Sequence, residues 1–259
     1  MRSIAAVNIV AFKTIVSKEI RRFMRIWVQT IVPPAVSALL YMMIFGTLIG
    51  ERVGEMDGHS YIDFIVPGII MMAIITNSYS NSVSSFFGAK FQNYLEELLI
   101  APVHNAVILT GFVVGGVCRG LVVGSLVAVV SLFFTRFSIE NPLITLTIVI
   151  LTSTLFSIGG VINSIFAKGF DDISIIPNFV LTPLTYLGGI FYSIKLLPDF
   201  WEGLSFINPV LYMINGFRYG ILGTSDIDIR LSFLIIMVFI VILAAIALRL
   251  LNKGVGIKS

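Results

Sequence analysis

Long runs of apolar residues alternate with short polar connections along the 259-residue chain. A helix needs roughly 20 apolar residues to cross a bilayer, and six of the runs reach that length: 28–50, 61–85, 106–134, 143–166, 175–194 and 232–250. The runs are continuous, whereas barrel strands alternate, and lipid offers the backbone no hydrogen-bond partners. The pattern therefore predicts an all-α, polytopic protein with six transmembrane helices and one membrane domain, 1–259.

Residues 13–27 have an amphipathic helical pattern ahead of the first run. Apolar residues on one side oppose basic residues on the other: Ile15, Ile20, Phe23 and Trp27 against Lys18, Arg21, Arg22 and Arg25. We interpret the segment as an interfacial helix on the inner leaflet, and a simple basic flank that sets orientation is the alternative. The first 27 residues lack a short apolar core with a cleavage site, so we expect no cleaved signal peptide.

A second amphipathic pattern lies at 90–100, inside the longest connection on the N-terminal side, 86–105. Apolar side chains on a loop exposed to water would be buried by a groove on a cytoplasmic partner, which favours a docking helix. An interfacial helix lying on lipid is the alternative. The candidate contact residues are Lys90, Phe91, Tyr94, Leu95, Glu96, Glu97, Leu98, Leu99 and Pro102, where Pro102 marks the end of the helix.

Composition and charge agree with a membrane protein and orient it. The chain is 57% hydrophobic with a mean hydropathy of +1.00. With the N-terminus inside, eleven Lys and Arg are cytoplasmic: Arg2, Lys13, Lys18, Arg21, Arg22, Arg25, Lys90, Lys168, Arg249, Lys253 and Lys258. Five are outside: Arg52, Arg136, Lys195, Arg218 and Arg230. Both termini should be cytoplasmic, and anionic lipid accounts for the net charge of +3 without a nucleic-acid partner.

Polar residues within the apolar runs are candidates for a transport pathway or for helix packing. They are Asn77, Asn81, Ser84, Ser85, Arg119, Asn178 and Thr182. Polar groups facing lipid would stay unpaired, so these side chains should face a neighbouring helix or a wet pathway. Arg119 should point inward unless it snorkels to an interface, and the nearby glycines form two stripes that let other helices approach: Gly111 and Gly115, then Gly116, Gly120 and Gly124.

The fifth run and the segment after it are interrupted by helix-breaking residues. Pro177 and Pro183 predict a bent helix over 175–194. Residues 197–223 are aromatic and apolar but too broken for a straight crossing, which favours a re-entrant or interfacial helical pair on the outer side.

Several kinds of chemistry find no support in the chain. Cys118 is the only cysteine, and no metalloprotease, nucleophile-elbow, dinucleotide or phosphate-loop motif is present. The outer acids Glu51, Glu55, Asp57 and Asp63 near His59 fit no metal-ligand spacing, so a solvated turn is favoured. We predict no catalytic residue, no metal and no cofactor in this chain.

The chain resembles the membrane subunit of type-2 ATP-binding cassette (ABC) exporters along most of its length. The likeness is carried by RFMRIWVQTIVPP (22–34), FIVPGIIMM (64–72), SSFFGAKFQNYLEELLIAPV (84–103), FAKGFDDISIIPNFVLTPLTYLGGIFYS (166–193) and INPVLYMINGFRYGILG (207–223). The resemblance implies a permease in the bacterial inner membrane, paired with a second copy and seated on a separate ATPase that binds ATP and Mg²⁺. It implies that 90–100 is the coupling helix and that Asn208, Pro209, Tyr212 and Arg218 mark the outer re-entrant motif.

The predicted function is therefore export through a permease driven by ATP hydrolysis on a partner, with a lipid-linked, amphipathic, drug-like or polysaccharide-like substrate. A secondary transporter is the first alternative, and it would need ion-binding groups at mid-membrane. A membrane-embedded enzyme that uses the outer acids is the second. Activity without nucleotide or partner would favour either alternative.

Overall fold

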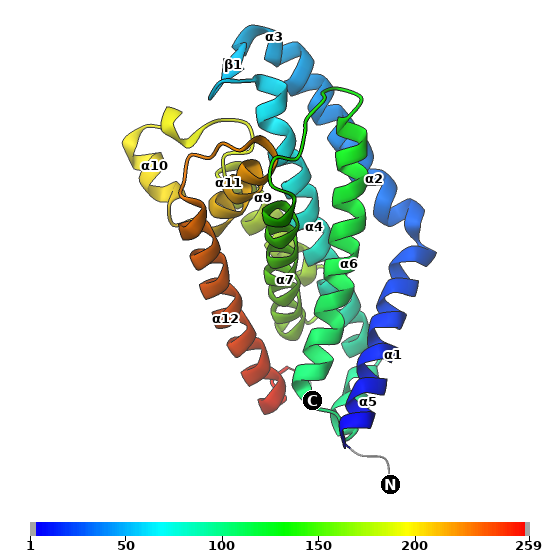
Figure 1. Ribbon diagram of the computed structural model, residues 1–259. Helices are drawn as coiled ribbons and strands as arrows, with labels where there is room; N and C mark the ends of the chain where they lie inside the picture. Colours follow the sequence, from blue (N-terminus) through cyan, green and yellow to red (C-terminus); the bar gives the residue numbers. More distant parts are fainter. Residues whose placement is uncertain (1–3, 257–259) are drawn as a thin grey trace.

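The computed structural model describes residues 4–256, most of which lie in helices. Two of the predicted inner cations, Arg2 and Lys258, lie outside this range. The helices form an elongated bundle, and the first and last described residues lie at the same end as the short helix α5, Tyr94–Ile100 (Figure 1). We call this the α5 end. The opposite end carries a two-stranded hairpin and is called the hairpin end.

Five described helical units are long and apolar enough to cross a membrane. The first is Trp27–Val53, made of α2 (Trp27–Tyr41), the π-helical η1 (Met42–Ile49) and α3 (Gly50–Val53). The others are α4 (Tyr61–Phe91), α6 (Asn105–Ser131), α7 (Pro142–Phe166) and α12 (Ile229–Lys253). They coincide with five of the six predicted runs, and α4 runs beyond the predicted bound of 85. The chain is a mostly helical, multi-pass membrane protein.

The remaining predicted run, 175–194, is shorter and more broken than expected. It consists of α8 (Asp172–Ile176), the π-helical η2 (Pro177–Leu181) and α9 (Thr182–Tyr186). Proline lacks a backbone N–H, and Gly189 has a φ of 77°, so the helix ends before the turn that follows. The segment still carries the chain from α7 at the α5 end back toward α9, which lies nearer the hairpin end (Figure 1).

Helix α4 is the centre of the bundle and is buried on nearly all sides. It packs against α6, α7 and α11 (Pro209–Leu222). A Cβ atom on Gly116 would lie within 3.0 Å of side-chain atoms of Ser157 and Ser82, so α4, α6 and α7 meet at nearly backbone contact. The second predicted glycine stripe, Gly116, Gly120 and Gly124, therefore allows close helix approach as expected.

The amphipathic helix α1 spans Ile4–Arg25, so it starts earlier than the predicted segment 13–27 and ends before it. Trp27 belongs to α2 because the chain bends at Ile26, whose backbone is not helical. The buried side chains of α1 are Ile15, Glu19 and Phe23. They lie against the first glycine stripe of α6, where a Cβ on Gly111 or Gly115 would clash with Ile15 or Glu19. Helix α1 thus runs beside the lower part of α6 (Figure 1).

The hairpin end is built from short elements. Strands β1 (Glu55–Met56) and β2 (His59–Ser60) pair antiparallel around Asp57 and Gly58, both with positive φ. Asp-Gly is a favoured sequence for such a two-residue turn. The 3₁₀ turn η3 (Ile194–Leu196) and helix α10 (Asp199–Ser205) precede α11 at this end.

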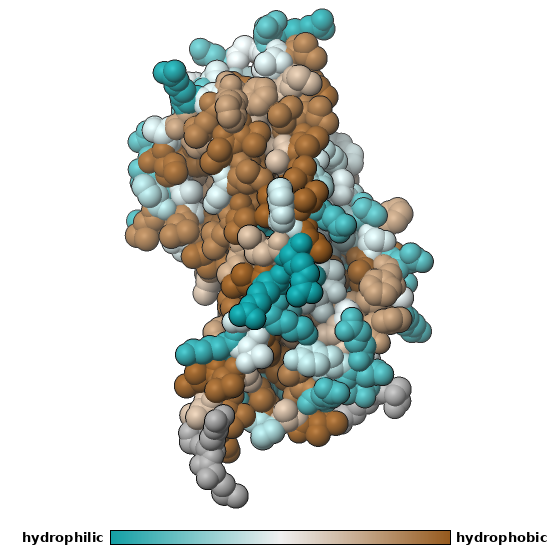
Figure 2. Space-filling view, turned by 90° about the vertical axis from the view of Figure 1, so that its right-hand side faces the viewer, coloured by the Kyte–Doolittle hydropathy of each residue, from teal (hydrophilic) through white to brown (hydrophobic). Residues whose placement is uncertain are grey.

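The face formed by α1 and α2 shows how the surface divides. Figure 2 shows a nearly continuous apolar upper part, whereas the lower part mixes polar and apolar residues. Exposed apolar side chains of α2 include Val28, Val32, Val36 and Leu40. A surface of this kind suits hydrocarbon or another membrane helix and is rare on soluble monomers.

Candidate functional site

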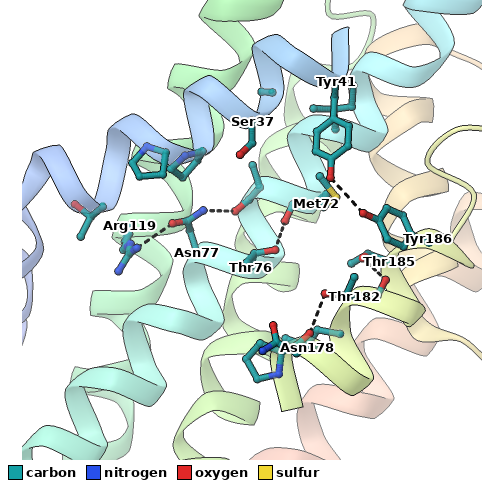
Figure 3. A pocket seen from close by; sticks show the side chains of 18 of the residues that line it. Ser37, Tyr41, Met72, Thr76, Asn77, Arg119, Asn178, Thr182, Thr185 and Tyr186 are labelled. Atoms are coloured by element: carbon teal, nitrogen blue, oxygen red, sulfur yellow. Dashed lines mark hydrogen bonds between the residues drawn. The ribbon is translucent and has the colours of Figure 1, made fainter. Parts of the chain in front are cut away.

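A cavity of about 400 Å³ lies between α2, α4 and the broken segment η2–α9 (Figure 3). Four of the seven polar pathway candidates line it: Asn77, Arg119, Asn178 and Thr182. The rest of the wall mixes hydroxyl and amide groups with apolar residues such as Pro33, Ile69 and Leu181. Cavities of this size and mixed lining are typical of small-molecule sites.

Arg119 is half-buried and comes from the middle of α6. Its Nη2 donates to Asn77 Oδ1 at 3.0 Å, and the Asn77 amide nitrogen in turn donates to the Ala73 carbonyl. Figure 3 shows Arg119 and Asn77 at one side of the cavity, with Tyr41 and Tyr186 at the other. The guanidinium therefore faces the cavity wall, which agrees with the inward orientation predicted from sequence.

Two tyrosines line the opposite side of the cavity. The hydroxyl groups of Tyr41 on α2 and Tyr186 on α9 lie 3.2 Å apart, within hydrogen-bond distance. Near them, Thr182 Oγ1 donates to the Pro177 carbonyl, one of the acceptors in a segment where proline interrupts the helix. Sequence reasoning missed both tyrosines, because a tyrosine in an apolar run is also typical of simple packing.

The other three pathway candidates, Asn81, Ser84 and Ser85, do not line this cavity. They contact α1 instead. Arg22 Nη2 donates to the Asn81 carbonyl at 3.0 Å and to Asn81 Oδ1 at 2.9 Å, and Arg22 Nη1 reaches Ser84 Oγ at 3.4 Å. The Ser85 hydroxyl donates to Glu19 Oε1, and Glu19 Oε2 lies 3.4 Å from Arg22. We call these five side chains the α1 lock.

Glu19 was missed by the sequence interpretation, although its side chain is fully buried. A signal was present: Glu19 lies midway between Ile15 and Phe23 at helical spacing, on the side of α1 that is otherwise apolar. An acid on an apolar stripe needs a buried partner, and Arg22 three residues later supplies it.

At the α5 end, the predicted helix over 90–100 is interrupted. Helix α4 ends at Phe91 and α5 begins at Tyr94, because Asn93 adopts a left-handed backbone with a φ of 58°. Asparagine tolerates this conformation better than most residues. The break turns α5 away from the axis of α4, so the two parts of the predicted segment present different faces.

Two of the candidate contact residues attach this region to the rest of the bundle. Lys90 Nζ donates to the carbonyls of Ile165 and Ala167 at 2.7 and 2.8 Å, where it satisfies acceptors at the C-terminal end of α7. Leu95 is fully buried against the bundle. Leu95 therefore positions α5 and offers no surface to a partner, which corrects the expectation for this residue. Lys90 is half-buried and lines the groove beside α5, so its contact with a partner stays a prediction.

The exposed apolar residues at this end are Phe91, Ile100, Phe166 and Phe170. Ile100 is 85% exposed, and the rings of Phe91 and Phe170 lie 5.3 Å apart. A groove of about 720 Å³ runs between α5 and the residues that follow α7, with Phe91, Glu96 and Lys168 in its wall. We call the four exposed apolar residues, together with this groove, the α5 patch.

Helix α1 also contacts α5 directly. The Lys18 ammonium lies 3.8 Å from the centroid of the Tyr94 ring, a cation–π contact, and burial lowers the pKa of Lys18. Beside the α5 patch, Asp172 accepts the backbone N–H groups of Lys168 and Gly169, and these bonds hold the pKa of its carboxyl below the usual value.

The four residues of the outer motif have structural contacts. Asn208 caps α11 by accepting the Val210 N–H at 2.9 Å, and Pro209 occupies the first helical position. Tyr212 donates its hydroxyl to the Phe206 carbonyl. Arg218 is 2% exposed, donates to the Gly189 carbonyl at 2.7 Å and stacks over the Phe64 ring.

The outer acids do not converge on one point. Asp63 accepts the hydroxyls of Ser60 and Thr135, and His59 lies 3.1 Å from the Thr224 hydroxyl. Within residues 4–256, no three His, Cys, Asp or Glu side chains come together as metal ligands would.

A bundle of apolar helices around a cavity of mixed lining, with a short helix at one end, is the architecture expected of a membrane transport permease. The chain belongs to the ABC-2 type transporter family, whose model matches residues 10–222.

Relatives of known name cover most of the chain. It is 57% identical over 250 residues to the inner membrane transport permease YadH of Escherichia coli K12, which covers 96% of this chain and 98% of that protein. More distantly, it is 21% identical over 216 residues to nodulation protein J of Rhizobium leguminosarum bv. viciae, covering 83% of each chain. It is 24% identical over 194 residues to nodulation protein J of Rhizobium meliloti, covering 74% of each chain. An inner-membrane location fits both the YadH name and the apolar helices.

Proposed function

We propose that the chain is the membrane-spanning subunit of an ABC exporter, in which two copies assemble with a separate cytoplasmic ATPase that binds ATP and Mg²⁺. Membership of the ABC-2 family implies such a partner. The protein lies in the bacterial inner membrane with the α5 end and both termini in the cytoplasm. The excess of Lys and Arg assigned to that end supports this orientation.

The broken segment α8–η2–α9 supplies the sixth crossing. Support comes from the path of the chain, because the first and last described residues lie at the same end, which requires an even number of crossings (Figure 1). Its interrupted backbone is tolerated at membrane depth because it lines a polar cavity, where side chains and water can satisfy freed carbonyls. Helices α10 and α11 then form the outer re-entrant pair.

The observation that carries the proposal is the α5 patch. Four large apolar side chains are exposed around a helix that Leu95 and Lys90 fix to the bundle. At the cytoplasmic end of a membrane protein, exposed apolar side chains beside an acidic helix suit a groove on a partner. We infer that the ATPase binds here, with Phe91 and Ile100 buried on binding and Glu97 at the rim.

Motion at α5 reaches the cavity through contacts that the structure provides. Lys18 joins α5 to α1, the α1 lock joins α1 to α4, and α1 continues through the bend at Ile26 into α2, a wall of the cavity. The ATP-bound and ATP-free partners must favour different positions of α5, and cargo then sees a cavity open to one side or to the other. The cargo is an amphipathic or lipid-linked molecule by family analogy.

Capture of the ATPase tests this function. We expect a tagged permease to retain an ABC ATPase encoded beside its gene, and the double substitution Glu97→Lys with Ile100→Ser to abolish retention, because it reverses a charge and removes a large apolar contact. A matched control exists at the hairpin end, where Glu140→Lys with Phe200→Ser makes the same changes at exposed positions.

The control pair should retain the ATPase fully. If the α5 pair retains it as well as wild type does while remaining a folded, monodisperse protein, the docking assignment is wrong. Transport activity that persists without nucleotide or partner would support a secondary transporter.

A further inference from the structure

Arg119 lacks the partner that an arginine at membrane depth needs. Among residues 4–256 the ion pairs are Glu19–Arg22 and Lys195–Asp226, so Arg119 takes part in none. Its hydrogen bond to the neutral Asn77 amide leaves the charge uncompensated, and its buried Nε has no hydrogen-bond partner among the described residues. Intramembrane cations are costly and normally pair with an anion or line a water-filled pathway.

The nearby arginine Arg22 shows what a paired cation looks like in the same protein. It binds Asn81, one helical turn from Asn77, and Glu19 balances its charge. The cavity beside Arg119 contains no acidic residue among those that line it. The cavity therefore has a net positive charge that nothing described in the chain neutralises.

The lining also offers both kinds of surface that an amphipathic molecule would contact. Amide and hydroxyl groups such as those of Asn77 and Thr182 line the cavity together with Arg119, and apolar surface comes from Ile69, Leu181 and Ala38. An anionic headgroup would accept two guanidinium hydrogen bonds, and its hydrocarbon part would lie on the apolar surface. A cavity of about 400 Å³ accommodates a headgroup with a short length of chain.

We propose that this cavity binds the phosphate or carboxylate headgroup of an anionic amphiphile, with Arg119 as its counter-ion, and that the exported cargo belongs to this chemical class. The inference rests on the proposed transport function and narrows it. Arg119 is a binding residue in this role, Asn77 positions its guanidinium, and the tyrosine pair Tyr41–Tyr186 lines the far side of the cavity.

Calorimetry on the purified permease in a neutral detergent tests the proposal with hexyl phosphate, which is soluble and carries both parts of the ligand. We expect hexyl phosphate to bind, and Arg119→Gln to weaken binding by about tenfold or more, since it removes a charge-assisted hydrogen-bond pair. Arg119→Lys keeps the charge and should lose less. The exposed Arg230 provides the control, because Arg230→Gln removes a cation outside the cavity and should change nothing.

Two further probes test the amphiphile itself. Inorganic phosphate lacks the hydrocarbon part and hexyl glucoside lacks the charge, so each should bind about tenfold or more weakly than hexyl phosphate. Equal binding of either probe, no binding of hexyl phosphate, or an unchanged affinity in Arg119→Gln would overturn the proposal. If Arg119→Gln is not monodisperse, the relative affinities of the three probes for the wild-type protein test the proposal on their own.

A resident phospholipid is the other source of such a headgroup. The permease in nanodiscs of phosphatidylcholine should bind hexyl phosphate within about threefold of its affinity in nanodiscs that contain phosphatidylglycerol. Strong competition by phosphatidylglycerol would assign the site to bilayer lipid and overturn the cargo assignment. Failure of the transport function is distinguishable, because it appears as loss of ATPase capture by the wild-type protein, which these binding assays do not measure.

Discussion

The polar run of α4 has two halves that look alike in sequence and differ in the structure. In the half nearer the hairpin end, Asn77 faces a cavity and accepts a hydrogen bond from Arg119. In the half nearer the α5 end, Asn81 and Ser85 face α1 and contact the buried pair Arg22–Glu19. Asn77 and Asn81 are one helical turn apart on the same face, yet one lines a cavity and the other joins two helices.

The difference lies in what covers each half. Helix α1 lies against the lower part of the bundle and brings an acid and a base that neutralise each other. Above the bend at Ile26 the chain continues as α2, whose side chains at this level include Pro33 and Pro34 and leave a cavity open. The neutralised pair Glu19–Arg22 therefore holds two helices together, whereas the unneutralised Arg119 beside the cavity can bind an anionic ligand. The comparison predicts that substitutions in the α1 lock reduce stability and that substitutions beside the cavity reduce ligand binding.

The largest loss of stability is expected for Glu19→Ala. The substitution removes the fully buried carboxylate that pairs with Arg22 and accepts the Ser85 hydroxyl, and loss of hydrogen bonds to a charged group costs about 1.5–3 kcal/mol, while the partly exposed Arg22 keeps its bonds to Asn81. We expect a lower midpoint of thermal unfolding in detergent and faster proteolysis of α1. Glu97→Ala is the control, because Glu97 is exposed and its removal should leave the midpoint nearly unchanged. Equal midpoints for the two variants would contradict a structural role for the lock.

Gly115→Val should have the next largest effect, because it separates α1 from α6. A Cβ atom at Gly115 would lie 2.5 Å from the Glu19 Cβ, so the two helices must move apart, and overpacking of this kind costs about 1–3 kcal/mol. Gly88→Val is the matched control, since a Cβ at Gly88 has no neighbour within 4 Å. The unfolding midpoints of both variants measure the difference. A larger loss at Gly88 would show that helix propensity, and not the α1–α6 contact, sets the cost.

The contrast between the two halves of α4 also explains which features could be predicted from the sequence. Five apolar runs became long helices because length and hydropathy determine a crossing regardless of its neighbours. The glycine stripes and the inward side of Arg119 were also predicted, since small and charged residues within membranes have few other places to lie. Periodicity identifies a face of a helix but does not say which neighbour covers it, so it could not separate Asn77 from Asn81.

Other features depended on the folded chain in ways that periodicity does not describe. Lys90 was expected to belong to one docking helix over 90–100, but the left-handed Asn93 splits that helix, and Lys90 binds the end of α7. The helix over 175–194 was expected to continue to its end, but it stops at Tyr186 before the turn at Gly189. Each correction arises from one backbone conformation.

A pair of identical substitutions one turn apart sharpens the comparison directly. Asn81→Leu removes an acceptor of Arg22 inside the lock and should cost about 1–2 kcal/mol of stability, while Arg22 keeps its bond to the backbone carbonyl. Asn77→Leu should cost less, because the cavity gives Arg119 access to water, yet it should weaken hexyl phosphate binding by releasing the guanidinium. Unfolding midpoints and calorimetry on both variants provide the test. If Asn77→Leu lost more stability and Asn81→Leu lost more binding, the packing role and the binding role would have been assigned to the wrong halves of α4.

The smallest expected effect concerns the contact between α1 and α5, where Lys18 lies over the Tyr94 ring. Because Lys18 remains partly exposed to solvent, the cation–π contact contributes only about 0.5 kcal/mol. A cycle of Lys18→Met, Tyr94→Leu and the double variant isolates this energy from the separate losses of each side chain. We also expect the double variant to retain the ATPase but to hydrolyse ATP with less stimulation by hexyl phosphate, since α5 would then move without drawing α1. If hexyl phosphate stimulates ATP hydrolysis fully in the double variant, motion of α5 is not transmitted to the α1 lock. Glu19 and Arg22 would then contribute to stability alone.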